Sequence, residues 1–429
     1  MRFANDLHGF EGAFMRYCKA KEVTGAWEWW QCKCRGISER WGQLADWVAG
    51  GRSNRALVRA GKFAKEGWVY VAPNDVWRFD TGGGKRILGI AGEVGTEARA
   101  MILSKGEKGA EMAFREMENG VGVLRVPVGD AGNEGLASVL AVAKGWIFED
   151  PLQFSRWADA RNGKRIVYDA HDVFLEASRG RGFEEEELER AERRLLEVAE
   201  RVWFCTEADR TATQRRYADL DGTGWEVLPN GISVEEAGGG AVPSRARKNR
   251  LAVGWKRPVV LFAGSNYGPN YEAVDEISRV WAPRHPGVTF VVLGMRMDRY
   301  LRDGGVQPAE NVVFTGLVDE AEKRALYDLS EVAIVPVKRG TGSSLKVPEA
   351  IARGKVVIGT RVGLRGFGEW TKWESVVASE RGEEALGEVL ARLEREPGAY
   401  DEACRGAAEE MQRRYTWRAL MEKWRGQWG

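Results

Sequence analysis

Residues 334–360 read Ile-Val-Pro-Val-Lys-Arg-Gly-Thr-Gly-Ser-Ser-Leu-Lys-Val-Pro-Glu-Ala-Ile-Ala-Arg-Gly-Lys-Val-Val-Ile-Gly-Thr. The apolar run Val332–Val337 predicts a strand that leads into a loop of glycines and hydroxyl residues. The dipeptide Pro348-Glu349 opens a predicted helix, and the apolar run Val356–Gly359 predicts a second strand. Strand, loop, helix and strand in this order predict part of a parallel α/β sheet.

The glycines of this loop favour an anion site. Gly340 and Gly342 permit positive φ and let an anion approach backbone N–H groups closely. The N-terminus of the following helix adds unpaired donors and a partial positive charge. Because Val347 precedes a proline, we expect the helix to begin near Pro348 and Lys346 to lie on the loop.

Glu349 has a different chemistry, because a negative charge does not suit a phosphate. One turn into such a helix, its carboxylate suits the cis-diol of a ribose. An ordinary strand–loop–helix connection with a solvated lysine is the alternative, because glycine-rich loops are common. The loop alone leaves both interpretations open.

Composition limits the class of protein. With 429 residues, the chain is long enough for two or three domains. Its 64 Lys and Arg residues balance 63 Asp and Glu residues, which argues against nucleic acid as a partner and against a basic membrane anchor. The first residues lack the apolar core of a signal peptide, and the least polar stretch, 135–148, is too short to span a bilayer. Five cysteines, an odd number, fit a reducing compartment. We therefore expect a cytoplasmic protein without a transmembrane segment, for which peripheral membrane contact stays open.

Two groups of residues are candidate metal ligands. Cys18, Cys32 and Cys34 lie near His8, but their spacing matches no standard zinc finger, so buried thiols are favoured. The acidic pair Asp219-Leu-Asp221 lies in a predicted turn and does not follow a buried strand. We therefore predict no metal site.

Short apolar runs and amphipathic stretches alternate from Trp68 onward, which predicts parallel α/β sheets. We expect a glycine turn at 82–84 and a helix over Arg86–Lys105. A composition break with three glycines at 238–240 indicates a linker, after which the alternation restarts. Two Rossmann-like domains should therefore face each other across a cleft that receives the ligand. The predicted segments are a Trp-rich accessory helical segment (1–66), a first domain (67–236), a linker (237–257), a second domain (258–405) and a terminal amphipathic helix (406–429).

Several sequence blocks of the second domain occur in the order and at the spacing of a known family. These blocks are Phe262-Ala-Gly264, Pro269-Asn-Tyr-Glu-Ala273, Val312-Val-Phe-Thr-Gly316, Ala325-Leu-Tyr327, Gly340-Thr-Gly-Ser-Ser-Leu-Lys-Val-Pro-Glu-Ala350, Gly363-Leu-Arg-Gly366 and Tyr415-Thr-Trp417. They resemble the C-terminal domain of retaining glycosyltransferases of the GT-B fold, of the family-4 type (glycosyl transferases group 1). In the first domain, Val167–Asp172 resembles the strand end that presents an active-site histidine, and Leu228–Ile232 resembles the loop that closes the domain. Residues 1–66 match no part of this family.

The resemblance implies transfer of a hexose or related sugar from a nucleotide diphosphate sugar, such as a UDP- or GDP-sugar, to an acceptor hydroxyl. The reaction would retain the anomeric configuration and would need neither a metal nor a bound cofactor. The acceptor would be a carbohydrate, a lipid-linked compound or a small molecule, in polysaccharide or glycoconjugate synthesis. The same resemblance assigns the acceptor to the first domain and the donor to the second, and implies that the terminal helix crosses back to the first domain.

Site residues follow from the same resemblance. His171 and Lys346 are the predicted catalytic residues, and Glu349 is the predicted ribose ligand. For His171, a structural histidine satisfied by Asp169 or Asp172 is the alternative. The predicted donor diphosphate ligands are Gly264, Ser265, Gly340, Thr341, Gly342, Ser343, Ser344, Leu345 and Lys346. The other predicted cleft residues are Asp169, Asn230, Asn266 and Asn270.

One position departs from the family pattern. Many members carry two glutamates separated by seven residues, and Thr341 stands where the first of these would be, whereas Glu349 corresponds to the second. A subset often found in exopolysaccharide pathways has a small residue there and a lysine three residues before the retained glutamate, as Lys346 is here. Thr341 keeps open the alternative of a catalytically silent nucleotide-sugar-binding or partner protein. A nucleotide-sugar epimerase is a further alternative, but its set of carboxylates and histidines is not found.

Overall fold

The computed structural model describes most of the chain after residue 54. The described residues are 55–73, 75–77, 82–106, 111–117, 120–127, 141–157, 163–178, 182–233, 254–265, 267–294, 303–304 and 307–429. The chain divides into two compact units, Met1–Ala56 and Leu57–Gly429, and both sheets belong to the second unit. Several predictions lie outside the described residues: nearly all of the Trp-rich segment, most of the linker, Asn266, and the group of Cys18, Cys32, Cys34 and His8.

The first sheet has eight strands in the order β3-β4-β2-β1-β5-β6-β7-β8. Every neighbouring pair is parallel except β3 and β4, which are antiparallel. Central strands such as Trp-Val-Tyr-Val-Ala are apolar without interruption, because helices cover both faces of a parallel sheet. The strands are β1 (Trp68–Ala72), β2 (Ala100–Lys105), β3 (Ala113–Glu116), β4 (Val121–Val126), β5 (Gly145–Phe148), β6 (Arg165–Ala170), β7 (Arg201–Phe204) and β8 (Trp225–Val227).

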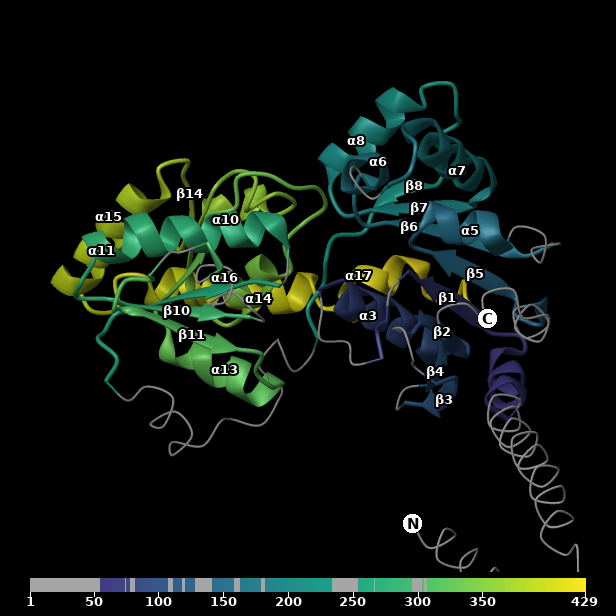
Figure 1. The fold of residues 1–429 in the computed structure, drawn as a ribbon, viewed down its shortest axis with the longest axis horizontal. Helices are drawn as coiled ribbons and strands as arrows, with labels where there is room; N and C mark the ends of the chain where they lie inside the picture. The colour runs from purple at the N-terminus through teal and green to yellow at the C-terminus, as the bar shows by residue number, and fades with distance from the viewer. Residues whose placement is uncertain are drawn as a thin grey trace, which may run out of the picture. The chain divides into compact units, whose positions relative to one another are not determined.

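The second sheet has six parallel strands in the order β11-β10-β9-β12-β13-β14. One face packs against α10, α11 and α15, and the other packs against α13, α14 and α16, so that the sheet has an apolar core on each side. In Figure 1, α10 and α13 lie on opposite sides of this sheet. The strands are β9 (Val259–Ala263), β10 (Thr289–Leu293), β11 (Val312–Gly316), β12 (Val332–Val335), β13 (Val356–Gly359) and β14 (Val376–Ala378).

The helices follow the strands as the alternation of the sequence predicts. In the first domain they are α3 (Gly82–Glu97), α5 (Pro151–Trp157), α6 (Phe174–Ser178), α7 (Glu185–Val198) and α8 (Glu207–Arg216). In the second they are α10 (Gly268–Glu276), a π-helical turn (Ile277–Trp281), α11 (Ala282–Arg284), α13 (Glu320–Leu329), α14 (Lys346–Ala352) and α15 (Gly382–Arg395). The chain then continues through α16 (Asp401–Arg414) and α17 (Trp417–Met421).

The prediction of a glycine turn followed by a helix over Arg86–Lys105 was wrong. The three glycines at 82–84 form the first turn of α3, which ends at Glu97, and β2 occupies Ala100–Lys105. A short continuous apolar run has no periodicity that separates a helix from a strand. Here the run is a strand because it pairs with β1 on one side and β4 on the other.

The last residues of the chain pack on the first sheet. Trp417, Met421, Trp424 and Trp428 share an apolar core with residues of β1, β7 and α3. Figure 1 shows α17 beside α3, and the two helices are in contact. The indole N–H of Trp68 donates to the backbone oxygen of Trp428 at 3.0 Å, and the two rings meet edge to face with centroids 5.0 Å apart. The carboxyl-terminal segment thus completes the core of the first domain.

We expect Trp428→Ala to destabilise the first domain, because the substitution leaves a large cavity beside Trp68 and Trp203. Truncation of a fully buried Trp to Ala typically lowers the free energy of unfolding by about 3–5 kcal/mol. The measurement is the midpoint of urea unfolding followed by tryptophan fluorescence. Leu317→Ala is the control, because Leu317 is 59% exposed and its loss should change stability by less than about 0.5 kcal/mol. Equal midpoints for the two variants would contradict this account of the core.

Candidate active site

The loop between β12 and α14 contacts the end of β6 in the first domain. Gly340 and Gly342 have φ of +131° and +68°. A Cβ on Gly342 would lie 2.4 Å from Oδ1 of Asp172 and 2.5 Å from the backbone oxygen of His171. The Thr341 hydroxyl donates to Oδ1 of Asp172 at 3.1 Å. Gly342 therefore serves a close approach between the two domains, in addition to the turn itself.

Helix α14 begins earlier than predicted, at Lys346, and its N-cap Leu345 already has helical angles. Val347 and Pro348 both lie in the first turn, where a missing N–H breaks no intrahelical hydrogen bond. The prediction that Lys346 lies on the loop was therefore wrong. This start fixes the direction of the Lys346 side chain from a rigid element.

Lys346 reaches toward the loop that follows β9. Its Nζ donates to Oδ1 of Asn270 at 2.7 Å and lies 4.5 Å from the centre of the Phe262 ring. The amide of Asn270 in turn donates to the backbone oxygen of Ser265 at 3.0 Å. Burial lowers the pKa of Lys346 to about 7, and no ion pair joins it to a carboxylate among the described residues. An ammonium group in these surroundings gains most from an anionic ligand.

Glu349 lies at the buried side of the same helix and is 8% exposed. Nζ of Lys323 is 2.5 Å from its Oε1, and the Tyr327 hydroxyl donates to Oε2 at 3.5 Å. Arg353 lies 3.9 Å away on the next turn. The carboxylate is thus ionically paired and held in one orientation.

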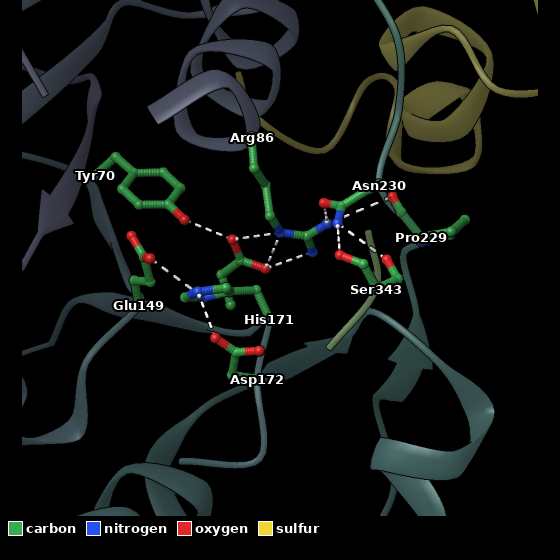
Figure 2. Close-up of polar contacts among 9 residues, drawn as sticks. Tyr70, Arg86, Glu149, His171, Asp172, Pro229, Asn230 and Ser343 are labelled. Carbon is green, nitrogen blue, oxygen red and sulfur yellow. Dashed lines mark hydrogen bonds and ion pairs between the residues drawn. The ribbon is translucent and has the colours of Figure 1, made fainter. Parts of the chain in front are cut away.

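His171 lies directly after β6, between two carboxylates (Figure 2). Its Nδ1 is 3.2 Å from Oε1 of Glu149, and its Nε2 is 3.3 Å from Oδ2 of Asp172. Burial alone would lower the pKa of His171, but the two carboxylates outweigh burial and raise it to about 10. Burial raises the pKa of Glu149 to about 7. The two carboxylates therefore favour the imidazolium form of His171.

Asp169 does not line the cleft as a free ligand, in contrast to the prediction. Its side chain is fully buried, and Arg86 donates to both carboxylate oxygens, with Nη2 2.6 Å from Oδ1. The Tyr70 hydroxyl donates to the same carboxylate at 2.5 Å. Asp169 therefore supports the strand end that carries His171 and does not pair with the imidazole.

Asn230 joins this buried ion pair to the loop between β12 and α14, which we call the donor-side loop (Figure 2). Its Oδ1 accepts from Arg86 at 3.1 Å, and its Nδ2 donates to the backbone oxygen and the hydroxyl of Ser343 at 3.0 and 2.9 Å. Because Arg86 can only donate, the orientation of the Asn230 amide is fixed. The structure thus brings His171, Asn230 and Ser343 to one place, with Lys346 and Asn270 on the donor side.

Three contributing residues were missed from the sequence. Glu149 ends the apolar run of β5, so the rule that ligand groups follow the carboxyl ends of parallel strands could have found it. Arg86 lies within a helix, as predicted, but carries no motif signal, and neither does Lys323. Among the described residues, no group of three or more His, Cys, Asp or Glu side chains could hold a metal ion. None of the helices in the described ranges is both long enough and apolar enough to cross a membrane.

Two parallel sheets whose strand ends bring polar groups of both domains together define a protein of the GT-B class. The family model described as glycosyl transferases group 1 matches residues 257–395, which lie in the second domain. This match, over the second domain, favours the predicted class of enzyme, a glycosyltransferase. A comparison with curated proteins found no match.

Solved structures confirm the predicted GT-B fold. Sucrose-phosphate synthase from Thermosynechococcus elongatus is similar with a TM-score of 0.63 and 15% identity, over 83% of this chain and 96% of that one. HepE from Anabaena, in complex with UDP and glucose, has a TM-score of 0.62 and 14% identity, over 83% and 98%. A UDP-forming α,α-trehalose-phosphate synthase from Burkholderia vietnamiensis has a TM-score of 0.59 and 14% identity, over 84% and 96%.

We expect Gly342→Ala to lower transferase or donor-hydrolysis activity at least about tenfold, because the new methyl group would push the loop away from Asp172. Gly354→Ala is the matched control: Gly354 has φ of +65°, but open space surrounds its Cβ position. Both variants carry a backbone strain of roughly 1–2 kcal/mol, and Gly342→Ala adds the clash with Asp172 and His171, so we expect a larger loss of thermal stability in Gly342→Ala. Equal activities in the two variants would show that the contact with Asp172 is not needed.

Proposed function

We propose that this protein transfers a hexose from a UDP- or GDP-sugar to an acceptor hydroxyl, with the diphosphate on Lys346 and the ribose on Glu349. The observation that carries this proposal is Lys346, a partly buried lysine whose Nζ donates to the side-chain oxygen of Asn270. A diphosphate would supply the negative charge that burial makes costly to leave unpaired. That HepE was solved with UDP and glucose favours UDP and a hexose as the donor.

Charge develops on the leaving diphosphate oxygen as the bond to the sugar breaks. One well-placed donor in a dry site is worth on the order of 3 kcal/mol of barrier. We assign this role to Lys346, the Ser343 and Ser344 hydroxyls and the N-terminus of α14. Gly264 and Ser265, on the loop that follows β9, are assigned to the same role. The contacts of Thr341 and Gly342 with the first domain favour a positioning role for these two residues over direct phosphate binding.

His171, Glu149 and Asp172 form the other half of the site. Sugar hydroxyls can donate to the two carboxylates and accept from the imidazolium, so this group suits the transferred sugar or the acceptor. A leaving phosphate oxygen can take the acceptor proton on the same face of the sugar, which removes the need for a separate base. This route is consistent with retention of the anomeric configuration.

The acceptor and the setting belong to the same proposal. We assign the acceptor to the first domain, as a carbohydrate, a lipid-linked compound or a small molecule, in polysaccharide or glycoconjugate synthesis. We also assign the protein to the cytoplasm, which the free thiols of Cys205 and Cys404 favour.

The test begins with a thermal-shift screen of the purified protein against UDP-, GDP-, ADP- and TDP-sugars. We expect stabilisation by a UDP- or GDP-sugar and slow hydrolysis of that donor, with loss of hydrolysis in Lys346→Ala and in Glu349→Ala. Lys346→Ala should weaken the binding of UDP far more than the binding of uridine, whereas Glu349→Ala should weaken the binding of both. Stabilisation without hydrolysis or transfer would favour the catalytically silent binder. No stabilisation by any nucleotide would contradict the proposal.

The affinity for the donor should fall as the pH rises through about 7. Burial lowers the pKa of Lys346 to about 7 in the free protein, so its ammonium is lost above that pH, and the diphosphate binds the charged form. A nucleotide diphosphate sugar has no phosphate group that titrates near pH 7, but burial also raises the pKa of Glu149 to about 7. Lys346→Arg is the control, because a guanidinium stays charged, so the part of the pH dependence that this variant loses reports on the lysine. A flat profile in the unmodified protein would refute this role of the lysine.

A further inference from the structure

The Arg365 side chain makes two hydrogen bonds to the backbone of the donor-side loop. Its Nε donates to the backbone oxygen of Gly342 at 2.6 Å, and its Nη1 donates to the backbone oxygen of Gly340 at 2.5 Å. These two carbonyl groups flank Thr341. The planar guanidinium therefore fixes both peptide planes at once, which a single point donor cannot do.

Close packing restricts the backbone that follows Arg365. The next residue, Gly366, has φ of +87°, and a Cβ there would lie 3.0 Å from Cβ of Ser343 and 3.1 Å from Cγ2 of Thr206. Thr206 belongs to the first domain, where its hydroxyl donates to Asp209 at 2.7 Å. The arginine thus lies where the loop, the segment after β13 and the first domain meet.

Two carboxylates of the first domain favour a cation at this place. Burial would raise the pKa of Asp172, but His171, the Thr341 hydroxyl and Arg365 act together to lower it. For Asp209, burial raises the pKa, and Thr206, Arg365 and the Gly342 N–H oppose that rise. Arg365 therefore offsets the negative charge that the first domain presents to the loop.

We propose that Arg365 is a positioning residue that acts through the loop: it holds Thr341 against Asp172, and Asp172 in turn holds His171. The chain of contacts is Arg365 to the carbonyls of Gly340 and Gly342, the Thr341 hydroxyl to Oδ1 of Asp172, and Oδ2 of Asp172 to Nε2 of His171. Arg365 touches neither the donor sugar nor the reacting atoms in this scheme. The inference rests on the proposed function for its kinetic test, but its structural test needs no nucleotide.

The kinetic test compares Arg365→Ala, Arg365→Lys and Thr341→Val in donor hydrolysis. We expect kcat to fall roughly tenfold or more in Arg365→Ala, since a small displacement of catalytic groups is costly, while the Kd of uridine stays unchanged because the ribose is held by Glu349. Arg365→Lys should recover only part of kcat, because an ammonium cannot bridge both carbonyls in the same geometry. In the double variant Arg365→Ala/Thr341→Val, kcat should be no lower than in the more affected single variant, because both residues act through the same contacts.

The structural test is hydrogen–deuterium exchange of the loop in the protein without nucleotide. Amides of residues 340–345 should exchange faster in Arg365→Ala, whereas Arg361→Ala, at an exposed position on the same segment, should leave exchange and kcat unchanged. Equal exchange and equal kcat in these two alanine variants would overturn the proposal. A parallel loss of uridine binding and of thermal stability in Arg365→Ala would also overturn it, because that result indicates general damage. Absence of nucleotide binding in the unmodified protein would refute the proposed function, and the exchange result would still decide the role of Arg365.

Discussion

The buried ion pair between Arg86 and Asp169 sets the geometry on which the candidate site depends. Both side chains are almost completely buried, and the guanidinium contacts both carboxylate oxygens. Removing either partner of such a pair leaves a buried charge uncompensated, at a cost of about 3–5 kcal/mol. The pair therefore ties α3 to the end of β6, two residues before His171. Because Arg86 also orients Asn230, the same interaction reaches Ser343 in the second domain.

The electrostatics of the site divide it into two halves of opposite character. Lys346 supplies positive charge at the start of α14, whereas Glu149, Asp172 and Asp209 gather on the side of the first domain. A diphosphate is repelled by the carboxylates and attracted by the lysine, so it belongs on the second domain. Sugar hydroxyls are neutral donors and suit the carboxylates. Under the proposed function, this division would orient a nucleotide sugar with its phosphates on one domain and its sugar toward the other.

Elements with a clear period or a clear end were predicted from the sequence, and contacts between distant residues were not. Strand β13 has the predicted limits, because an uninterrupted apolar run between two polar segments defines it. Strand β2 was missed because its identity depends on its neighbours in the sheet. The motif around Lys346 stands out by its local pattern, but Asp169 and Arg86 are 83 positions apart, and nothing local reveals that they pair. Asp169 was for that reason placed in the cleft, although it lies beneath it.

The neighbours of Thr341 account for the one departure from the family pattern. In this chain the side chain at position 341 faces Asp172, which accepts the Thr341 hydroxyl and contacts His171 on its other oxygen. A carboxylate at position 341 would face the carboxylate of Asp172 at hydrogen-bond distance, and two such groups cannot both stay ionised there without cost. A hydroxyl donor is therefore the compatible side chain when Asp172 occupies this place. Since Glu149 and Asp172 already supply carboxylates beside His171, the missing glutamate does not by itself argue against transfer. The departure is instead explained by the residues that this particular fold brings to the loop.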